Sequence, residues 1–345
     1  MNYVLTRRQF FTRAAGAAAA LALGGPSLRA ASFRHRIHKA MIIGQVTEAA
    51  LRPLKEAGFE GVETTYICPE IEAALGRAAG GKAGAAKRSV AEYEEDWRKG
   101  RAIADKLGMR VHSVLRGWMR FNSNNPKEVE DSLELTRLAL RAAKTYGADD
   151  ILLVPCRVVG LPMPEPWDFD IAFDAETGHV TRVAAGDNSP FKDYIEAQNH
   201  ATDTSRAAVQ KLIPLAEQLK VIIAIENVWN NLWVKPDLFK NFVASFQSPW
   251  ARAYFDIGNH VKYAPPQEWI KVLGSLIVRL HVKDFRLNPD GHDGKFVHPR
   301  EGSVNWPAVR QALEDVGFEG WASIEDSGLP LPEFNRRFDL ILNGE

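Results

Sequence analysis

Short apolar runs alternate with longer amphipathic stretches along most of the chain. In the first half, runs of strand length occupy 38–44, 58–64, 109–117 and 149–156, and stretches with helical periodicity occupy 51–58, 89–107 and 125–147. Pro126 near the first turn of the third helix and Gly147 at its end are typical helix boundary residues. This strict alternation of strand and helix indicates parallel βαβ units.

The alternation is interrupted at residues 157–202, which show no pattern of a core helix. Within this segment, two stretches of alternating apolar and polar residues, 168–174 and 179–184, flank the turn sequence AETG, which predicts a β-hairpin. Long insertions in compact domains are usually functional. We therefore expect a lid-like insertion that covers the active site.

Regular alternation resumes after the insertion and continues toward the C-terminus. It predicts helices at 203–219, 236–246, 266–273 and 305–316, separated by strands that end at Glu226, at Asp256, at or just after His281, and at Glu325. Eight strands then alternate with helices between residues 36 and 343. The simplest assembly of eight such strands is a closed (β/α)8 TIM barrel, an α/β fold, with a long insertion after strand 4.

The strands of the second half carry polar side chains at or near their carboxyl ends. Glu226, Asp256 and Glu325 each follow a mostly apolar run, and His281 lies inside or at the end of another. Taken singly, each of these acidic residues is more simply explained as a helix cap or as part of a surface ion pair. In a parallel barrel, however, all four positions converge on one mouth. We expect them to bind a divalent metal, with Mn2+ the best fit and Mg2+, Co2+, Zn2+ or Fe2+ as alternatives.

Five short motifs carry a resemblance to a known family: GFEGVE (58–63), IEN (225–227), FDIGN (255–259), HVKDF (281–285) and IED (324–326). In these motifs the chain resembles the sugar isomerases and epimerases with a xylose isomerase-like barrel, over roughly residues 36–343. That family also includes hydroxypyruvate isomerases, inosose dehydratases and ketose 3-epimerases. The resemblance implies that the same four residues are the metal ligands, and that Glu226 and Glu325 are also the catalytic acid and base, as in the ketose 3-epimerase branch.

The chemistry of such a site also follows from the residues. A metal that holds a hydroxyl and a neighbouring carbonyl stabilises the enediolate formed when a proton leaves the carbon between them. Two glutamates on opposite sides of the mouth would each serve one face of the enediolate. Proton return gives epimerisation or isomerisation of a free sugar, keto-sugar or related polyol. Loss of a leaving group makes a lyase or dehydratase acting on a keto-sugar or oxidised glycoside. A non-catalytic sugar-binding protein is the alternative from another class.

Other side chains near these motifs are candidates for substrate binding. Most of them also have a plainer structural explanation. Lys283 could pair with Asp284, Trp229 could be a packed residue, and Asn230 could belong to a turn. His112 and His260 could be core residues, because a lone histidine on a strand is more often part of the core. Glu63 lies near a strand end, and it could instead brace an arginine or lysine such as Lys283. The substrate-binding candidates are Arg286, Lys283, Trp229, Asn230, His112 and His260.

The first 31 residues have the pattern of a twin-arginine export signal. Arg7 and Arg8 precede two phenylalanines, an apolar run at 14–23, and then glycine, proline and small residues. The apolar run is too short to span a bilayer about 30 Å thick as a helix. The signal predicts export, to the periplasm for example, with the twin-arginine machinery as a partner.

Charge and cysteine content narrow the function classes further. Removing residues 1–31 takes four arginines and no acid from the 43 basic and 43 acidic residues, so the mature chain has a net charge of about −4. This balance argues against nucleic acid as a ligand, and hence against the DNA-repair endonucleases that share the barrel. Cys68 and Cys156 are expected to be free thiols. The sequence allows a homo-oligomer without indicating one.

Overall fold

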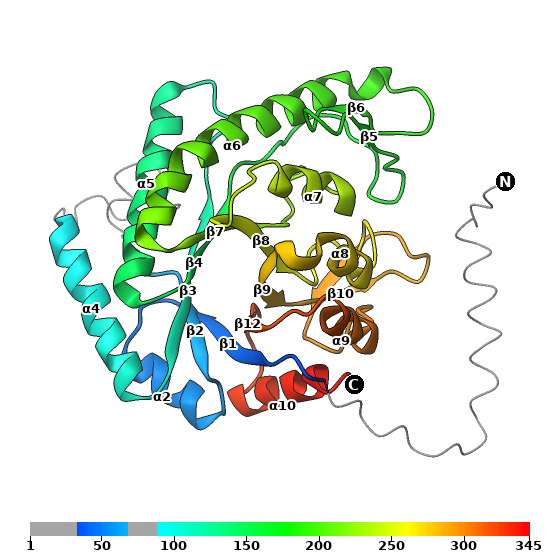
Figure 1. The fold of residues 1–345 in the computed structure, drawn as a ribbon. Helices are drawn as coiled ribbons and strands as arrows, with labels where there is room; N and C mark the ends of the chain where they lie inside the picture. Colours follow the sequence, from blue (N-terminus) through cyan, green and yellow to red (C-terminus); the bar gives the residue numbers. More distant parts are fainter. Residues whose placement is uncertain (1–32, 68–87) are drawn as a thin grey trace, which may run out of the picture. The chain divides into compact units, whose positions relative to one another are not determined.

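The computed structural model of the chain describes residues 33–67 and 88–345, in which eight parallel strands close into a barrel (Figure 1). Each strand hydrogen-bonds its two neighbours in parallel register, in the order β1-β12-β9-β8-β7-β4-β3-β2. The expected (β/α)8 fold is therefore confirmed. The barrel strands are β1 (Ile37–Ile43), β2 (Gly61–Thr64), β3 (Arg110–Trp118), β4 (Asp150–Val154), β7 (Ile222–Glu226), β8 (Ala251–Asp256), β9 (Ile277–Val282) and β12 (Gly320–Ile324).

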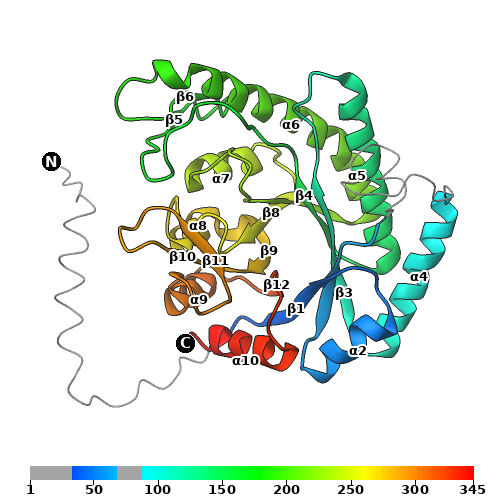
Figure 2. The same ribbon diagram turned by 180° about the vertical axis from the view of Figure 1, so that it is seen from behind.

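A helix follows every barrel strand, and the helices surround the barrel in both views (Figures 1 and 2). Local sequence defines several of their ends. Ser89 and Glu92 form a capping box at the start of α4, and Gly147, at φ 81°, ends α5 in the left-handed conformation that glycine favours. The helices are α2 (Glu48–Glu56), α4 (Val90–Lys106), α5 (Pro126–Tyr146), α6 (Lys192–Leu219), α7 (Pro236–Ala244), α8 (Pro266–Leu273), α9 (Trp306–Asp315) and α10 (Leu331–Leu342).

Two layers of apolar side chains hold the barrel together. The larger layer lies between strands and helices, and a smaller one, which includes Leu152, Ala224 and Tyr254, fills the barrel. All five residues of β4 are buried, as expected for a parallel strand covered on both faces. This packing fixes the strand ends that carry the polar cluster.

The segment after β4 contains the expected hairpin but is shorter than the sequence suggested. Strands β5 (Ala172–Phe173) and β6 (Val180–Arg182) pair antiparallel, and Asn199 of α6 bonds both backbone groups of Val180. Helix α6 begins at Lys192, eleven residues before the predicted start at 203, so the insertion ends near residue 191. The hairpin packs on α6, and its role as a lid remains a prediction.

A second hairpin follows β9 and was not expected from the sequence. Strands β10 (Asp284–Leu287) and β11 (Gly294–Val297) pair antiparallel beside the barrel mouth. The turn sequence Asn288-Pro-Asp-Gly291 between two alternating stretches is the signal that could have predicted it, and Gly291 has φ 78°. This hairpin provides one wall of the candidate site.

Two of the sequence predictions lie outside the described residues. They are the export signal at 1–31 and Cys68. Cys156 is a buried free thiol, as expected. Among the helices within the described residues, none is long and apolar enough to cross a membrane.

Candidate metal centre and active site

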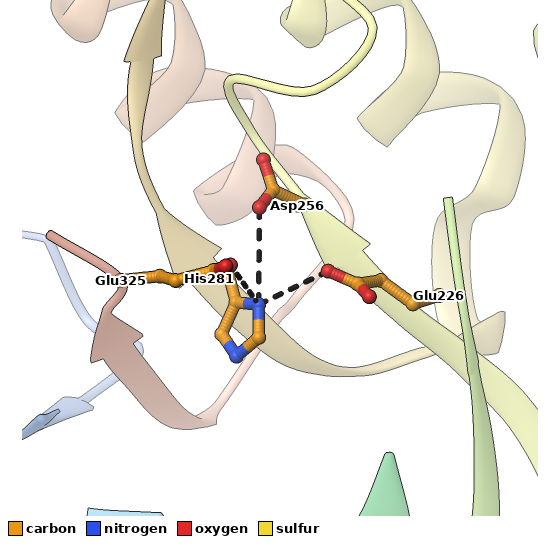
Figure 3. Close-up of side chains that lie close together, drawn as sticks. All are labelled: Glu226, Asp256, His281 and Glu325. Atoms are coloured by element: carbon orange, nitrogen blue, oxygen red, sulfur yellow. Dashed lines mark hydrogen bonds and ion pairs between the residues drawn. The ribbon is translucent and has the colours of Figure 1, made fainter. Parts of the chain in front are cut away.

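Four side chains meet at the carboxyl ends of neighbouring strands β7, β8, β9 and β12. The four are the expected Glu226, Asp256, His281 and Glu325, and one ligand atom from each lies within 4.8 Å of the others. Figure 3 shows the three carboxylates directed at His281 Nδ1, with distances of 3.2 Å to Glu226 Oε1, 3.8 Å to Asp256 Oδ2 and 3.0 Å to Glu325 Oε2. The geometry is therefore that of three carboxylate oxygens and one imidazole nitrogen around a common point.

The sequence around Asp256 holds its carboxylate in place. Asp256 Oδ1 accepts the backbone N–H groups of Gly258 at 2.8 Å and Asn259 at 2.7 Å. Asn227 fixes the backbone of Asp256 by bonding both its N–H and its carbonyl oxygen. Gly258 is required because a Cβ there would lie 2.6 Å from Cβ of Lys283. The motifs IEN and FDIGN thus act together, and Asp256 Oδ2 is left facing the cluster.

The ring of His281 is oriented from its other side by Glu63 of β2. Glu63 Oε2 lies 2.7 Å from His281 Nε2 and accepts the hydroxyl of Tyr254 at 2.8 Å, while Oε1 accepts Ser113 at 3.3 Å. A carboxylate on Nε2 keeps the proton there and leaves Nδ1 free as a ligand. The expectation that Glu63 braces Lys283 is wrong, because its side chain points into the barrel toward His281 rather than along the mouth.

Burial and mutual repulsion shift the pKa values of the cluster. Burial raises the pKa of Glu226, and it raises the pKa of Asp256 to about 7. Burial acts to lower the pKa of His281, but the neighbouring carboxylates of Glu63 and Glu325 outweigh it and raise that pKa well above its ordinary value. Burial acts to raise the pKa of Glu325, yet the adjacent imidazole and ammonium groups lower it to about 2. Without a metal, protons must therefore supply the positive charge in this cluster.

The donor set fits a divalent cation. Asp256 Oδ2 is buried and accepts no hydrogen bond within the described residues. A buried carboxylate oxygen without a hydrogen bond is costly unless a cation or proton meets it, and the nearest cationic nitrogen, Nζ of Lys283, lies 3.5 Å away. Carboxylate oxygens with one imidazole suit Mg2+, Mn2+ and similar ions, and four protein ligands leave positions open for substrate oxygens.

Lys283 joins the cluster from the end of β9. Its Nζ lies 3.0 Å from Glu325 Oε1 and 3.5 Å from Asp256 Oδ2, and it donates to Asn259 Oδ1 at 3.2 Å. The alternative pairing with Asp284 is absent. Successive strand residues point in opposite directions, so the Asp284 carboxylate instead accepts backbone N–H groups on the far side of the strand. Lys283 is thus part of the cluster beside Glu325, and its role in substrate binding stays a prediction.

Trp229 and Arg286 lie on the rim of the mouth. Trp229 is 38% exposed, donates its indole N–H to the carbonyl oxygen of Asn259, and carries Lys262 Nζ 3.8 Å from its ring centroid. Arg286 on β10 is exposed and donates to the carbonyl oxygen of Glu301 through Nε at 3.0 Å and Nη2 at 2.7 Å. Both side chains remain candidates for substrate contact.

The other three substrate-binding candidates are placed elsewhere. Asn230 is buried and completes the turn after β7 by bonding the Cys156 carbonyl and the Leu232 N–H. His112 is near the amino end of β3 and shares a hydrogen bond with Ser323 at 2.8 Å. His260 is buried against Trp269, and its Nε2 lies 3.0 Å from the carbonyl oxygen of Val228. Each of the three side chains thus has a structural partner within the protein, and its role in substrate binding stays a prediction.

A parallel (β/α)8 barrel with a carboxylate and imidazole cluster at its mouth defines the class of protein. The chain belongs to the xylose isomerase-like TIM barrel family, which it matches over residues 51–333.

Similar proteins support this fold. An uncharacterised protein of Methanocaldococcus jannaschii is 25% identical over 133 residues, 37% of this chain and 44% of that protein, so the match spans less than half of the relative. A solved D-tagatose 3-epimerase-like protein is 16% identical, with a TM-score of 0.60 and coverage of 88% of this chain and 98% of the other. A xylose isomerase-like protein from Mycobacterium smegmatis, solved with magnesium, is 16% identical, with a TM-score of 0.56 and coverage of 90% and 96%.

Proposed function

We propose that the protein is a divalent-metal-dependent sugar isomerase or epimerase that removes a proton next to a carbonyl group of a free sugar or keto-sugar. The observation that carries this proposal is the placement of two glutamates, from β7 and β12, on either side of one histidine nitrogen. The epimerase-like structural neighbour and the magnesium in the M. smegmatis structure support the same class of substrate and of metal.

Glu226, Asp256, His281 and Glu325 would hold the metal. The bound ion would supply positive charge to the substrate oxygens and so favour loss of a proton from the carbon between them. Mn2+ is our first choice, since oxygen-rich sites with one imidazole suit it.

The protein's own groups would then move the proton. Strands β8 and β9 separate the two glutamate-bearing strands, so Glu226 and Glu325 approach the substrate from different sides. One carboxylate accepts the proton from one face of the substrate carbon, and the other donates a proton to the opposite face or to the adjacent carbon. Lys283, 3.0 Å from Glu325, donates to a substrate oxygen, and Trp229 covers the sugar from the rim.

We also propose that the protein is exported, with residues 1–31 as the signal. The paired Arg7 and Arg8 before a short apolar run support this. Replacing both arginines with lysine should retain the protein inside the cell, as measured by immunoblotting of periplasmic and cytoplasmic fractions. Unchanged export of that variant would contradict a twin-arginine route.

The decisive experiment is solvent exchange on a panel of keto-sugars. Protein stripped with a chelator and reloaded with Mn2+, Mg2+, Co2+, Zn2+ or Fe2+ is incubated with each sugar in D2O, and exchange next to the carbonyl is followed by NMR. We expect exchange that depends on the metal. An eliminated product would identify a lyase, binding without exchange would identify a sugar-binding protein, and full activity of metal-free protein would overturn the proposal.

A further inference from the structure

A cavity of about 390 Å³ opens beside Glu325, under the β10–β11 hairpin. This volume lies within the range of small-molecule sites, which is about 300–1,000 Å³. The basic side chains that line it are Lys283, Arg286, Lys295 and His298, and Phe296 provides an aromatic wall. Since Glu325 also lines it, the cavity is continuous with the candidate active site.

The acidic groups around this cavity are already compensated. Asp284 accepts the backbone N–H groups of Arg300 at 2.9 Å and Gly302 at 3.0 Å. Asp326 pairs with His298 at 2.7 Å, and Glu301 pairs with Arg337 at 2.7 Å. Each of these carboxylates therefore already has its own hydrogen-bond or ion-pair partners, which are groups other than Arg286 and Lys295.

Two of the cations, Arg286 and Lys295, form no ion pair with a carboxylate within the described residues. Glu301, whose pKa is lowered mainly by Arg337 and also by Arg286, is paired with Arg337. Arg286 and Lys295 stand directly opposite each other in the β10–β11 register. Like charges at opposite positions of an antiparallel pair are destabilising. Arg286 binds a neutral carbonyl oxygen, that of Glu301, which fixes its guanidinium group without cancelling the charge. The hairpin thus presents two positively charged side chains that form no ion pair to a cavity that adjoins the cluster.

The wall that carries these charges is held rigidly. The Asp284 carboxylate also accepts the Trp306 indole N–H at 3.2 Å, which fastens the base of β10 to α9. At the other end, Gly294 has φ 149°, and a Cβ there would lie 2.0 Å from the carbonyl oxygen of Arg286. Only glycine allows this close approach of the two strands. The backbone that carries both cations and the guanidinium group of Arg286 are therefore positioned before any ligand arrives, which lowers the entropy cost of binding.

We propose that the cavity binds an anionic group of the substrate, a carboxylate or a phosphate, so that the substrate is an acidic sugar. This inference rests on the proposed function, in which the reacting carbon lies at the metal cluster. A planar guanidinium group beside an ammonium group is well suited to carboxylate or phosphate oxygens. The sugar ring would lie between Glu325 and the hairpin, with its charged end at Arg286 and Lys295.

The test compares sugars that differ only in charge. D-Fructose, D-fructuronate and D-fructose 6-phosphate are titrated into the full-length, Mn2+-loaded protein by calorimetry. We expect at least one charged sugar to bind about tenfold or more tightly than D-fructose, because a charge-assisted hydrogen bond contributes about that much. Preference for D-fructuronate identifies a carboxylate site, and preference for the 6-phosphate identifies a phosphate site. Equal affinity for all three overturns the inference.

Variants then locate the effect. Lys295→Met and Arg286→Gln should each remove most of the preference for the charged sugar. The matched control is Lys271→Met, an exposed lysine on α8 that removes the same charge elsewhere, and it should retain the preference. A preference that survives both hairpin variants contradicts the assignment of the site.

Exchange in D2O separates this inference from the proposed function. Exchange of neutral keto-sugars without any charge preference would sustain the function and overturn the acidic-sugar site. A hairpin-dependent charge preference without exchange would sustain the site and overturn the function.

Discussion

The barrel carries a charged cluster at each end, buried at the mouth and partly buried at the amino end, and the two clusters differ in charge balance. At the amino end, Arg279 Nε lies 2.6 Å from Asp150 Oδ2 and its Nη2 lies 3.0 Å from Asp149, which also pairs with Arg110 at 2.5 Å. Two arginines there meet two aspartates. At the mouth, one lysine and one histidine meet four carboxylates, those of Glu63, Glu226, Asp256 and Glu325.

This difference distinguishes a structural ion network from a binding site. The charges of the amino-end cluster balance one another within the protein, because Arg279 reaches across the barrel from β9 to pair with Asp150 of β4. The mouth cluster carries an excess of two to three negative charges, depending on the protonation of His281, and a divalent ion would nearly balance it. In this architecture the amino end generally serves stability and the carboxyl end serves catalysis.

The largest effect is expected from Asp256→Asn. This change keeps an oxygen for the N–H groups of Gly258 and Asn259 but replaces the ligand oxygen by an amide, so the turn should survive while the metal is lost. Metal analysis of the purified variant should show occupancy near zero, and activity should fall below detection. Normal occupancy would remove Asp256 from the ligand set.

Glu226→Gln and Glu325→Gln test how the two sides of the mouth divide the chemistry. Glutamine cannot accept the proton, so each change should lower kcat by about 10²–10⁴-fold. One variant should retain exchange of substrate hydrogen in D2O without forming product, and the other should retain exchange only from the product side. Metal occupancy is measured alongside. Wild-type turnover by a metal-loaded variant would show that this glutamate is only a ligand.

Arg279→Met tests the opposite end. Breaking a buried pair leaves Asp150 uncompensated, and burial already raises the pKa of Asp150 to about 7. We expect the free energy of unfolding in urea to fall by about 3–5 kcal/mol. Metal affinity should stay at the wild-type value. Lost metal affinity with unchanged stability would contradict the separation of the two clusters.

Local patterns explain what could be predicted from the sequence. The eight strands and the four cluster residues follow from apolar runs that end in a polar group, because carboxyl ends of parallel strands must meet. The same logic does not place His112, since it does not tell the amino end of a strand from its middle, and the structure puts this residue near the amino end of β3. Helix α6 begins early because residues 192–202 contain Tyr194, Gln198 and Ala201 on one buried face, a pattern hidden by polar neighbours.

Contacts across the barrel could not be predicted in this way. Glu63 and His281 are 218 residues apart and meet only because β2 and β9 face each other through the barrel interior. Which of several polar groups reaches the histidine depends on strand register and tilt, and local composition does not encode either. Lys283 pairs with Glu325 and Asp256 at the ends of the neighbouring strands, and composition alone did not favour these two residues over the adjacent Asp284.

Glu63→Gln sharpens the comparison because it alters the mouth without removing a ligand. An amide still bonds His281 Nε2 or Tyr254 but loses the negative charge that orients the ring, so metal affinity should fall about 10–100-fold. Calorimetric titration with Mn2+ and the visible spectrum of the Co2+-loaded variant would report the change. Tyr254→Phe, which removes only one bond to Glu63, should have a smaller effect. Unchanged affinity and spectrum in Glu63→Gln would limit Glu63 to packing.

The smallest expected effect is a pH dependence of stability that the metal reverses. Burial raises the folded pKa of Asp256 to about 7, and the surrounding carboxylates raise that of His281 despite its burial. A raised pKa contributes stability at low pH that is lost as the pH rises through the folded value, so the metal-free protein should lose stability between about pH 5 and 8. The pKa of Glu325 is lowered to about 2, so this group contributes stability of the opposite pH dependence, which is lost only as the pH falls into strong acid.

Metal requires the deprotonated ligands, so the stabilisation by Mn2+ should grow with pH over the same interval. Each displaced proton adds about 1.4 kcal/mol per pH unit, which corresponds to roughly 2–4 °C in Tm. Thermal unfolding with and without excess Mn2+ at pH 5, 6, 7 and 8 measures this difference. Asp256→Asn should abolish the growth of the Mn2+-dependent Tm difference with pH. Arg279→Met should lower the Tm both with and without Mn2+ but keep that pH-dependent difference. If the metal-induced shift in Tm stayed constant from pH 5 to 8, the ion would displace no proton from either Asp256 or His281.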